Sequence, residues 1–127
     1  MYVEENLNPN NSRVGDCVIR AISKVLGQSW EHTYMDLAIL GMQMKDLPSA
    51  NVVWGAYLHD KGFHRRSSPD PCPDCYTIED FCRDYPFGTF LAATGSHVVA
   101  IIDGQYFDTW RSGSEVPIFY FYRESEV

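Results

Sequence analysis

Apolar side chains recur at helical spacing through the first half of the chain. The pattern predicts a helix over residues 16–26, with Asp16 suited to cap its start and Gly27 suited to end it. The apolar positions of that helix are Val18, Ile19, Ile22, Val25 and Leu26. Further helices are predicted over residues 29–41, 48–62 and 77–85. Prolines at positions 69, 71 and 73 interrupt the helical pattern before the helix predicted over residues 77–85.

The second half of the chain is rich in β-branched and aromatic residues separated by turn residues. These runs predict strands over residues 89–94, 96–102, 105–110 and 116–123. Asp103-Gly104 is a strong signal for a two-residue hairpin turn, and the four strands are predicted to form an antiparallel meander. Helices that precede strands indicate an α+β fold. Because no linker divides two core-forming halves, residues 1–127 are predicted to form a single domain.

The predicted hairpin brings polar residues together. With Asp103 and Gly104 in the loop, His97 lies opposite Trp110 and diagonal to Asp108. Diagonal neighbours have Cα atoms roughly 7–8 Å apart, within reach of a side-chain hydrogen bond. Trp110 could shield that bond from water. The alternative is an ordinary structural histidine with an aspartate near a strand end, and a bulge would separate the pair.

Cys17 is predicted to lie in the first turn of the first helix. The positive end of the helix dipole and the unpaired backbone N–H groups there both favour a thiolate. The Cys17 N–H could also donate to an oxyanion, and an amide from Asn8, Asn10 or Asn11 could supply a second donor. The alternatives are a small buried cysteine and an ordinary asparagine-rich turn.

Together these residues predict a Cys-His-Asp catalytic triad. Cys17 would be the nucleophile, His97 the general base and acid, and Asp108 the group that orients the imidazole. A nucleophile and a base that are distant in sequence are typical of a site that the fold assembles.

The motifs resemble the papain-like cysteine peptidase superfamily, in particular its small bacterial and phage members. Gly15-Asp16-Cys17 resembles the Gly-x-Cys segment that opens the central helix, and Asn11 stands where the family carries its oxyanion-hole glutamine. Ser96-His97-Val98 resembles the histidine strand, and Asp108-Thr109-Trp110 resembles the Asn-Ser-Trp segment whose tryptophan covers the triad. The resemblance implies a papain-like domain, with N-terminal helices packed on a C-terminal antiparallel sheet, and thiol protease activity.

The charge composition limits the classes of partner that the protein can be expected to bind. The chain has 10 Lys and Arg against 17 Asp and Glu, a net charge of −7, and no basic stripe. This argues against nucleic acid and anionic membrane surfaces as partners. No apolar run approaches the roughly 18–20 residues that span a bilayer, and the first residues do not resemble a signal peptide. A cytoplasmic protein with a peptide or protein substrate is expected. The sequence does not specify an oligomeric state.

The remaining cysteines lie at positions 72, 75 and 82. Cys72 and Cys75 form a CxxC pair, which with Cys82 and His64 could hold zinc, or could form a disulfide or a redox pair. Only one half of a zinc site is paired, and the CxxC lies among prolines rather than at a helix start. Unpaired structural cysteines, with Cys82 buried, are therefore favoured, and no metal or cofactor is expected.

The leading prediction is a cysteine hydrolase that cleaves a peptide or isopeptide amide through a thioester. One alternative is a catalytically silent papain-like fold that serves as a protein-binding module. A second is an acyltransferase that uses the same triad with an amine in place of water. A third is a zinc-stabilised interaction domain built on Cys72 and Cys75.

Overall fold

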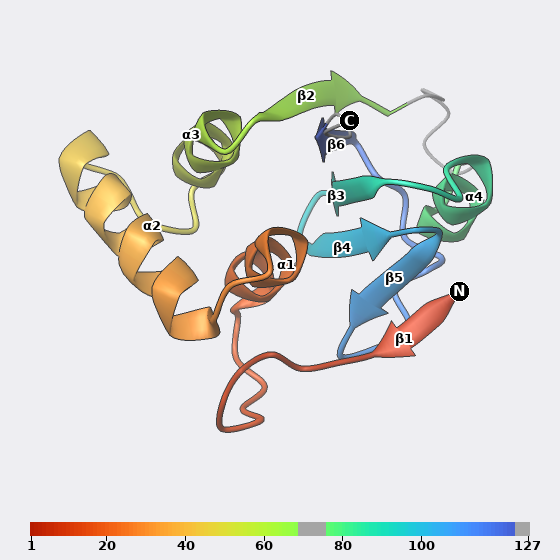
Figure 1. Ribbon diagram of the computed structural model, residues 1–127, viewed down its shortest axis with the longest axis horizontal. Coiled ribbons are helices and arrows are strands. Elements are labelled where there is room, and N and C mark those ends of the chain that lie inside the picture. The colour runs from red at the N-terminus through yellow and green to blue at the C-terminus, as the bar shows by residue number, and fades with distance from the viewer. Residues whose placement is uncertain (69–75, 124–127) are drawn as a thin grey trace.

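Figure 1 shows the computed structural model of the chain, which describes residues 1–68 and 76–123. The described residues form an α+β fold, as the sequence predicts. The helices are α1 (Cys17–Leu26), α2 (Trp30–Met44), α3 (Asn51–Asp60) and α4 (Ile78–Asp84). The strands are β1 (Tyr2–Glu4), β2 (Phe63–Ser67), β3 (Thr89–Ala93), β4 (Val98–Ile102), β5 (Gln105–Asp108) and β6 (Phe119–Arg123).

The strands form one mixed sheet in the order β1-β5-β4-β3-β6-β2. β3, β4 and β5 make the predicted antiparallel meander, but β6 pairs with β3 instead of continuing beside β5. The prediction of a four-stranded meander is therefore wrong at its last strand. β1 pairs parallel with β5 and β2 pairs antiparallel with β6, and the sequence analysis missed both strands. In β2 only Phe63 is buried and the four residues after it are exposed. The strand therefore lacks the alternation of apolar and polar residues by which a strand is predicted.

The helices begin close to where the sequence places them, but one ends later. Ser29 caps α2 by accepting a hydrogen bond from the His32 N–H, whereas the Asp16 side chain does not cap α1. α2 continues through Gly41 and ends at Met44. This glycine therefore does not end the helix, contrary to the prediction. A Cβ at position 41 would lie 2.9 Å from a backbone oxygen of the following turn, so glycine there permits close approach.

Helices cover both faces of the sheet. α1, α2 and α3 lie on one side and α4 lies on the other (Figure 1). Alternate residues of β4 therefore enter different cores: Val98 and Ala100 pack with α1, and Val99 and Ile101 pack with α4. No helix in the described part of the chain has the length and apolarity needed to cross a bilayer.

The β4–β5 hairpin has the predicted register, with Ile102 opposite Gln105 across Asp103 and Gly104. Both turn residues have positive φ, 51° and 75°, as a type I′ turn requires. The pairing ends earlier than the sequence suggests, since β4 begins at Val98 and β5 ends at Asp108. His97 and Trp110 therefore lie just beyond the paired strands, at the end of the hairpin that faces α1.

Candidate active site

Cys17 is the first residue of α1 and is partly buried. Its side chain lines a pocket of about 350 Å³ whose wall also includes His97 and Trp110. The helix begins here because Val18, Ile22 and Val25 form an apolar face that packs against the sheet. The thiol is thus held at the positive end of a helix and opens onto a pocket.

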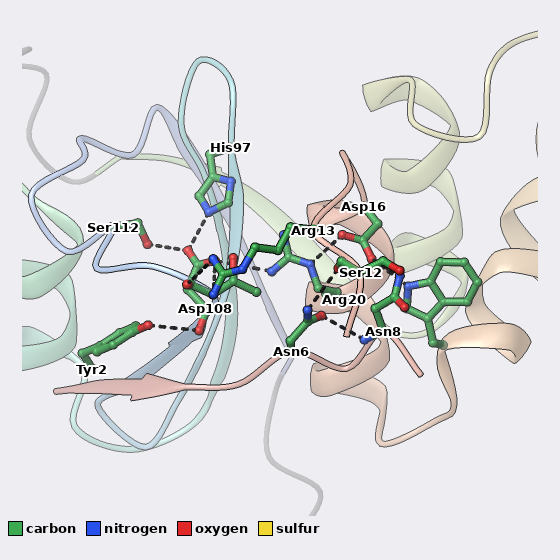
Figure 2. Close-up of polar contacts among 12 residues, drawn as sticks. Tyr2, Asn6, Asn8, Ser12, Arg13, Asp16, Arg20, His97, Asp108 and Ser112 are labelled. Atoms are coloured by element: carbon green, nitrogen blue, oxygen red, sulfur yellow. Dashed lines mark hydrogen bonds and ion pairs between the residues drawn. The ribbon is translucent and has the colours of Figure 1, made fainter. Parts of the chain in front are cut away.

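His97 connects the cysteine to a buried carboxylate. Its Nε2 lies 2.6 Å from Oδ2 of Asp108, whose exposed fraction is 1% (Figure 2). The interaction of its ring with the Cys17 thiol raises the pKa of His97 and lowers that of Cys17, and both side chains line the same pocket. Because Nε2 is engaged by Asp108, Nδ1 is the ring nitrogen that remains for the sulfur. The structure therefore brings Cys17, His97 and Asp108 together in the order expected of a catalytic triad.

The surroundings of Cys17 favour its thiolate. Burial on its own would raise the pKa of the thiol. The hydrogen bond with His97, a backbone hydrogen bond from Val98 and the positive charges of His97 and Arg20 outweigh burial, and the pKa of Cys17 is lowered. A lowered pKa increases the fraction of the nucleophilic form at neutral pH.

His97 is correspondingly shifted toward its protonated form. Burial would lower the pKa of the imidazole, but the hydrogen bonds and negative charges of Asp108 and Cys17 raise it to about 9. Asp108 itself has a lowered pKa: burial opposes ionisation, and the hydrogen bonds from His97 and Ser112 outweigh burial. The surroundings therefore favour the thiolate of Cys17, the imidazolium of His97 and the carboxylate of Asp108.

Asp108 accepts hydrogen bonds from several groups besides His97. Ser112 Oγ donates to Oδ2 at 2.5 Å, the Thr109 N–H donates to Oδ1 at 2.8 Å, and Arg20 Nη1 lies 3.4 Å from Oδ1. These donors fix the carboxylate and keep it ionised while it is buried. The sequence analysis missed Ser112 and Arg20.

Arg20 links Asp108 to a second buried carboxylate. Its Nε lies 2.8 Å from Oδ1 of Asp16, so the guanidinium bridges the two acids (Figure 2). Asp16 also accepts hydrogen bonds from Trp30 Nε1 and Asn8 Nδ2, at 3.0 Å and 3.2 Å. The helix that carries Cys17 is thereby tied to the strand that carries Asp108. The spacing of four residues between Asp16 and Arg20 was a sequence signal for the first ion pair but not for the second.

Trp110 contacts the triad while remaining open to solvent. Its ring centroid lies 5.1 Å from that of His97, as expected of a covering residue. Its side chain is nevertheless 44% exposed. The indole therefore forms part of the pocket wall beside the histidine.

The structure does not bring Asn11 to the pocket. Asn11 is exposed, has a φ of 55°, and lies in a turn closed by a hydrogen bond from its N–H to the Asn8 carbonyl. The pocket wall begins at the next residue, Ser12. Asn11 is therefore not positioned as an oxyanion donor, whereas the backbone of Cys17 remains at the pocket.

Cys82 is separate from this site. Cys82 is buried on α4, on the opposite face of the sheet, and burial raises the pKa of its thiol. Cys72 and Cys75 lie outside the described residues. Residues 1–68 and 76–123 contain no group of three or more side chains placed to hold a metal ion.

The contact with Asp108 sets the charge state of His97, which gives a prediction for its titration. The ring should titrate at about pH 9, and Asp108→Asn should move the pKa downward because the carboxylate charge is lost. Imidazole NMR spectra recorded from pH 5 to 10 measure both values. Asp84→Asn removes a carboxylate that binds Tyr76 and should leave His97 unchanged. A wild-type pKa near 6.5 would contradict the prediction.

Comparison with protein-family models, curated proteins and solved structures gives no match to this chain.

Proposed function

We propose that this protein is a cysteine hydrolase that cleaves a peptide or isopeptide amide, with Cys17, His97 and Asp108 as its catalytic triad. The observation that carries the proposal is that Cys17 and His97 line one pocket and that Nε2 of His97 lies 2.6 Å from the buried Asp108 carboxylate. The resemblance of the Gly15-Asp16-Cys17 and Asp108-Thr109-Trp110 segments to papain-like peptidases supports the same chemistry.

In the first half of the proposed reaction, the Cys17 thiolate attacks the carbonyl carbon of the amide. The negative charge moves to the carbonyl oxygen, where the N–H of Cys17 at the start of α1 can donate a hydrogen bond. The C–N bond then breaks as the His97 imidazolium gives its proton to the leaving nitrogen. The products of this half are a free amine, a thioester on Cys17 and a neutral imidazole.

In the second half, neutral His97 accepts a proton from water, and the resulting oxygen nucleophile attacks the thioester. The C–S bond breaks, a carboxylic acid leaves, and the thiolate–imidazolium pair is restored. Asp108 holds the ring through Nε2 in both halves, so that Nδ1 carries each proton. It also stabilises the imidazolium, which gives up its proton in the first half and forms again in the second.

An activated ester tests this proposal without knowledge of the natural substrate. With p-nitrophenyl acetate, the wild-type protein should release about one equivalent of p-nitrophenolate in a burst, followed by slower turnover. Intact-mass and peptide mass spectrometry should locate the acetyl group on Cys17. Cys17→Ala keeps every other cysteine and should show no burst. Absence of acylation at Cys17 in the wild-type protein would contradict the proposal and favour a silent binding module.

The fate of the acyl group separates hydrolysis from acyl transfer. When a primary amine such as glycinamide is added, a hydrolase should still form mainly acetate. Formation of mainly the acetylated amine would instead favour the acyltransferase alternative.

A further inference from the structure

We propose that the pocket at Cys17 selects substrates with a carboxylate on the leaving side of the scissile bond, and that Arg13 is the residue that binds it. The assignment of a leaving side rests on the proposed hydrolase function. The preference of the pocket for an anion is independent of that function, because it follows from the charges of the pocket wall.

The charged groups of the pocket wall are Arg13, Asp16, Arg20 and His97. Asp16 is buried and pairs with Arg20, whose guanidinium also reaches Asp108 behind the wall. His97 pairs with Asp108. Each carboxylate at the site is thus already matched by a cation, and the remaining anionic group of the wall is the Cys17 thiolate, which lies beside His97.

Arg13 differs from these groups because it has no ion-pair partner among residues 1–68 and 76–123. One of its N–H groups, on Nη1, donates to the Thr109 carbonyl at 3.3 Å, and its side chain is otherwise exposed. A guanidinium has five N–H donors, so most of them remain for a ligand. A carboxylate fits this planar donor set and can accept two parallel hydrogen bonds.

The bond to Thr109 also indicates which part of a substrate Arg13 would meet. His97 must lie beside the leaving nitrogen to protonate it, and Trp110 contacts the His97 ring. Thr109 directly precedes Trp110, and Figure 2 shows the Arg13 side chain reaching from the loop before α1 toward the strand that carries Asp108. The guanidinium therefore lies beside the segment that carries Trp110, the neighbour of His97, and on this ground we assign it to the leaving side.

The negative net charge of the protein gives a further reason to assign the binding of an anion to Arg13. With a charge of −7 the chain repels anions at long range, so an anionic substrate needs a cation at the pocket itself. Arg13 supplies one within a wall whose other cations are already paired. We therefore infer a substrate with an acidic side chain, or a terminal carboxylate, in the first leaving residue.

Alkylation of Cys17 tests the preference with two reagents of similar size, iodoacetate and iodoacetamide. The ratio of their rate constants, measured by peptide mass spectrometry at pH 7 and low salt, should fall about fivefold in Arg13→Gln, the effect of an exposed charge pair. Arg111→Gln is the matched control, since Arg111 is exposed, contacts the Tyr2 ring and does not line the pocket. An unchanged ratio in Arg13→Gln, or an equal fall in both variants, would overturn the proposal.

A pair of peptides that differ only in Glu or Gln at the first leaving position separates this proposal from the proposed function. Wild-type protein should cleave the Glu peptide about fivefold faster, and Arg13→Gln should remove the difference. If the alkylation ratio depends on Arg13 but neither peptide is cleaved, the anion site holds and the hydrolase proposal fails. If both peptides are cleaved equally and the ratio does not change, only the anion proposal fails.

Discussion

His97→Ala is expected to reduce turnover of p-nitrophenyl acetate by about 10²–10⁴-fold, the usual contribution of a general acid–base group. It should also slow alkylation of Cys17 by iodoacetamide at pH 6 by about tenfold or more. Burial raises the pKa of the Cys17 thiol, and His97 provides the main hydrogen bond that lowers it. Without the ring, the thiolate fraction falls about tenfold for each unit that the pKa rises, and the greater nucleophilicity of a more basic thiolate offsets only part of this.

The chain contains its own control for this experiment. Cys82 is buried on the far face of the sheet and has a raised pKa, so its slow alkylation should be the same with and without His97. Mass spectrometry that resolves individual peptides, at several pH values between 5 and 9, reports both cysteines in one sample. Equal alkylation of Cys17 in the wild-type protein and in His97→Ala would show that the imidazole does not activate the thiol.

Arg20→Met is expected to lower the free energy of unfolding by about 3 kcal/mol, as removal of one partner of a buried ion pair usually does. The guanidinium is the shared cation of Asp16 and Asp108, which are 5% and 1% exposed. Methionine preserves much of the side-chain length and removes the charge. Asp16 then keeps only the neutral donors of Trp30 and Asn8.

Lys24→Met is the matched control for the loss of unfolding free energy in Arg20→Met. Lys24 lies one turn further along α1 and pairs with Glu5 at 3.0 Å, but both side chains are more than a quarter exposed. An ion pair of this kind contributes about 0–1 kcal/mol. Urea unfolding at pH 7 measures both variants. Equal losses would mean that the bridge between the two acids contributes no more than a surface ion pair.

The parts of the site that could be predicted are those governed by local signals. Asp103-Gly104 fixes the hairpin register through the backbone conformation of two adjacent residues, and this register alone brings His97 near Asp108. The position of Cys17 at a helix start follows from the apolar spacing of the nine residues that follow it in α1. Short-range chemistry was therefore sufficient for the three proposed catalytic side chains.

Features set by long-range packing could not be predicted in this way. Arg20 meets Asp108 because α1 packs against β4, and no pattern around either residue encodes that contact. The placement of β6 beside β3 also depends on distant partners, since Trp54 of α3 stacks on Phe119 of β6 and packs at a tilt against Phe121. Apolar alternation identifies a strand but not its neighbour.

The asparagines before Cys17 also differ in a way that the sequence does not predict, although they lie within one loop. Asn8 and Asn11 are chemically identical, yet Asn8 is buried against Asp16 while Asn11 faces solvent in a left-handed turn. The family resemblance favoured Asn11 by its spacing from the nucleophile. Backbone geometry decides which amide is buried, and that geometry is not visible in residue types that all favour turns.

The distance in sequence between the nucleophile and its base has a consequence for biosynthesis. His97 follows Cys17 by 80 positions, and β4 and β5 are made long after α1. While the chain is being translated, the thiol leaves the ribosome as an ordinary cysteine, without the imidazole that activates it. Under the proposed function, the nascent polypeptide would be latent until the hairpin docks on the helix and brings His97 to Cys17.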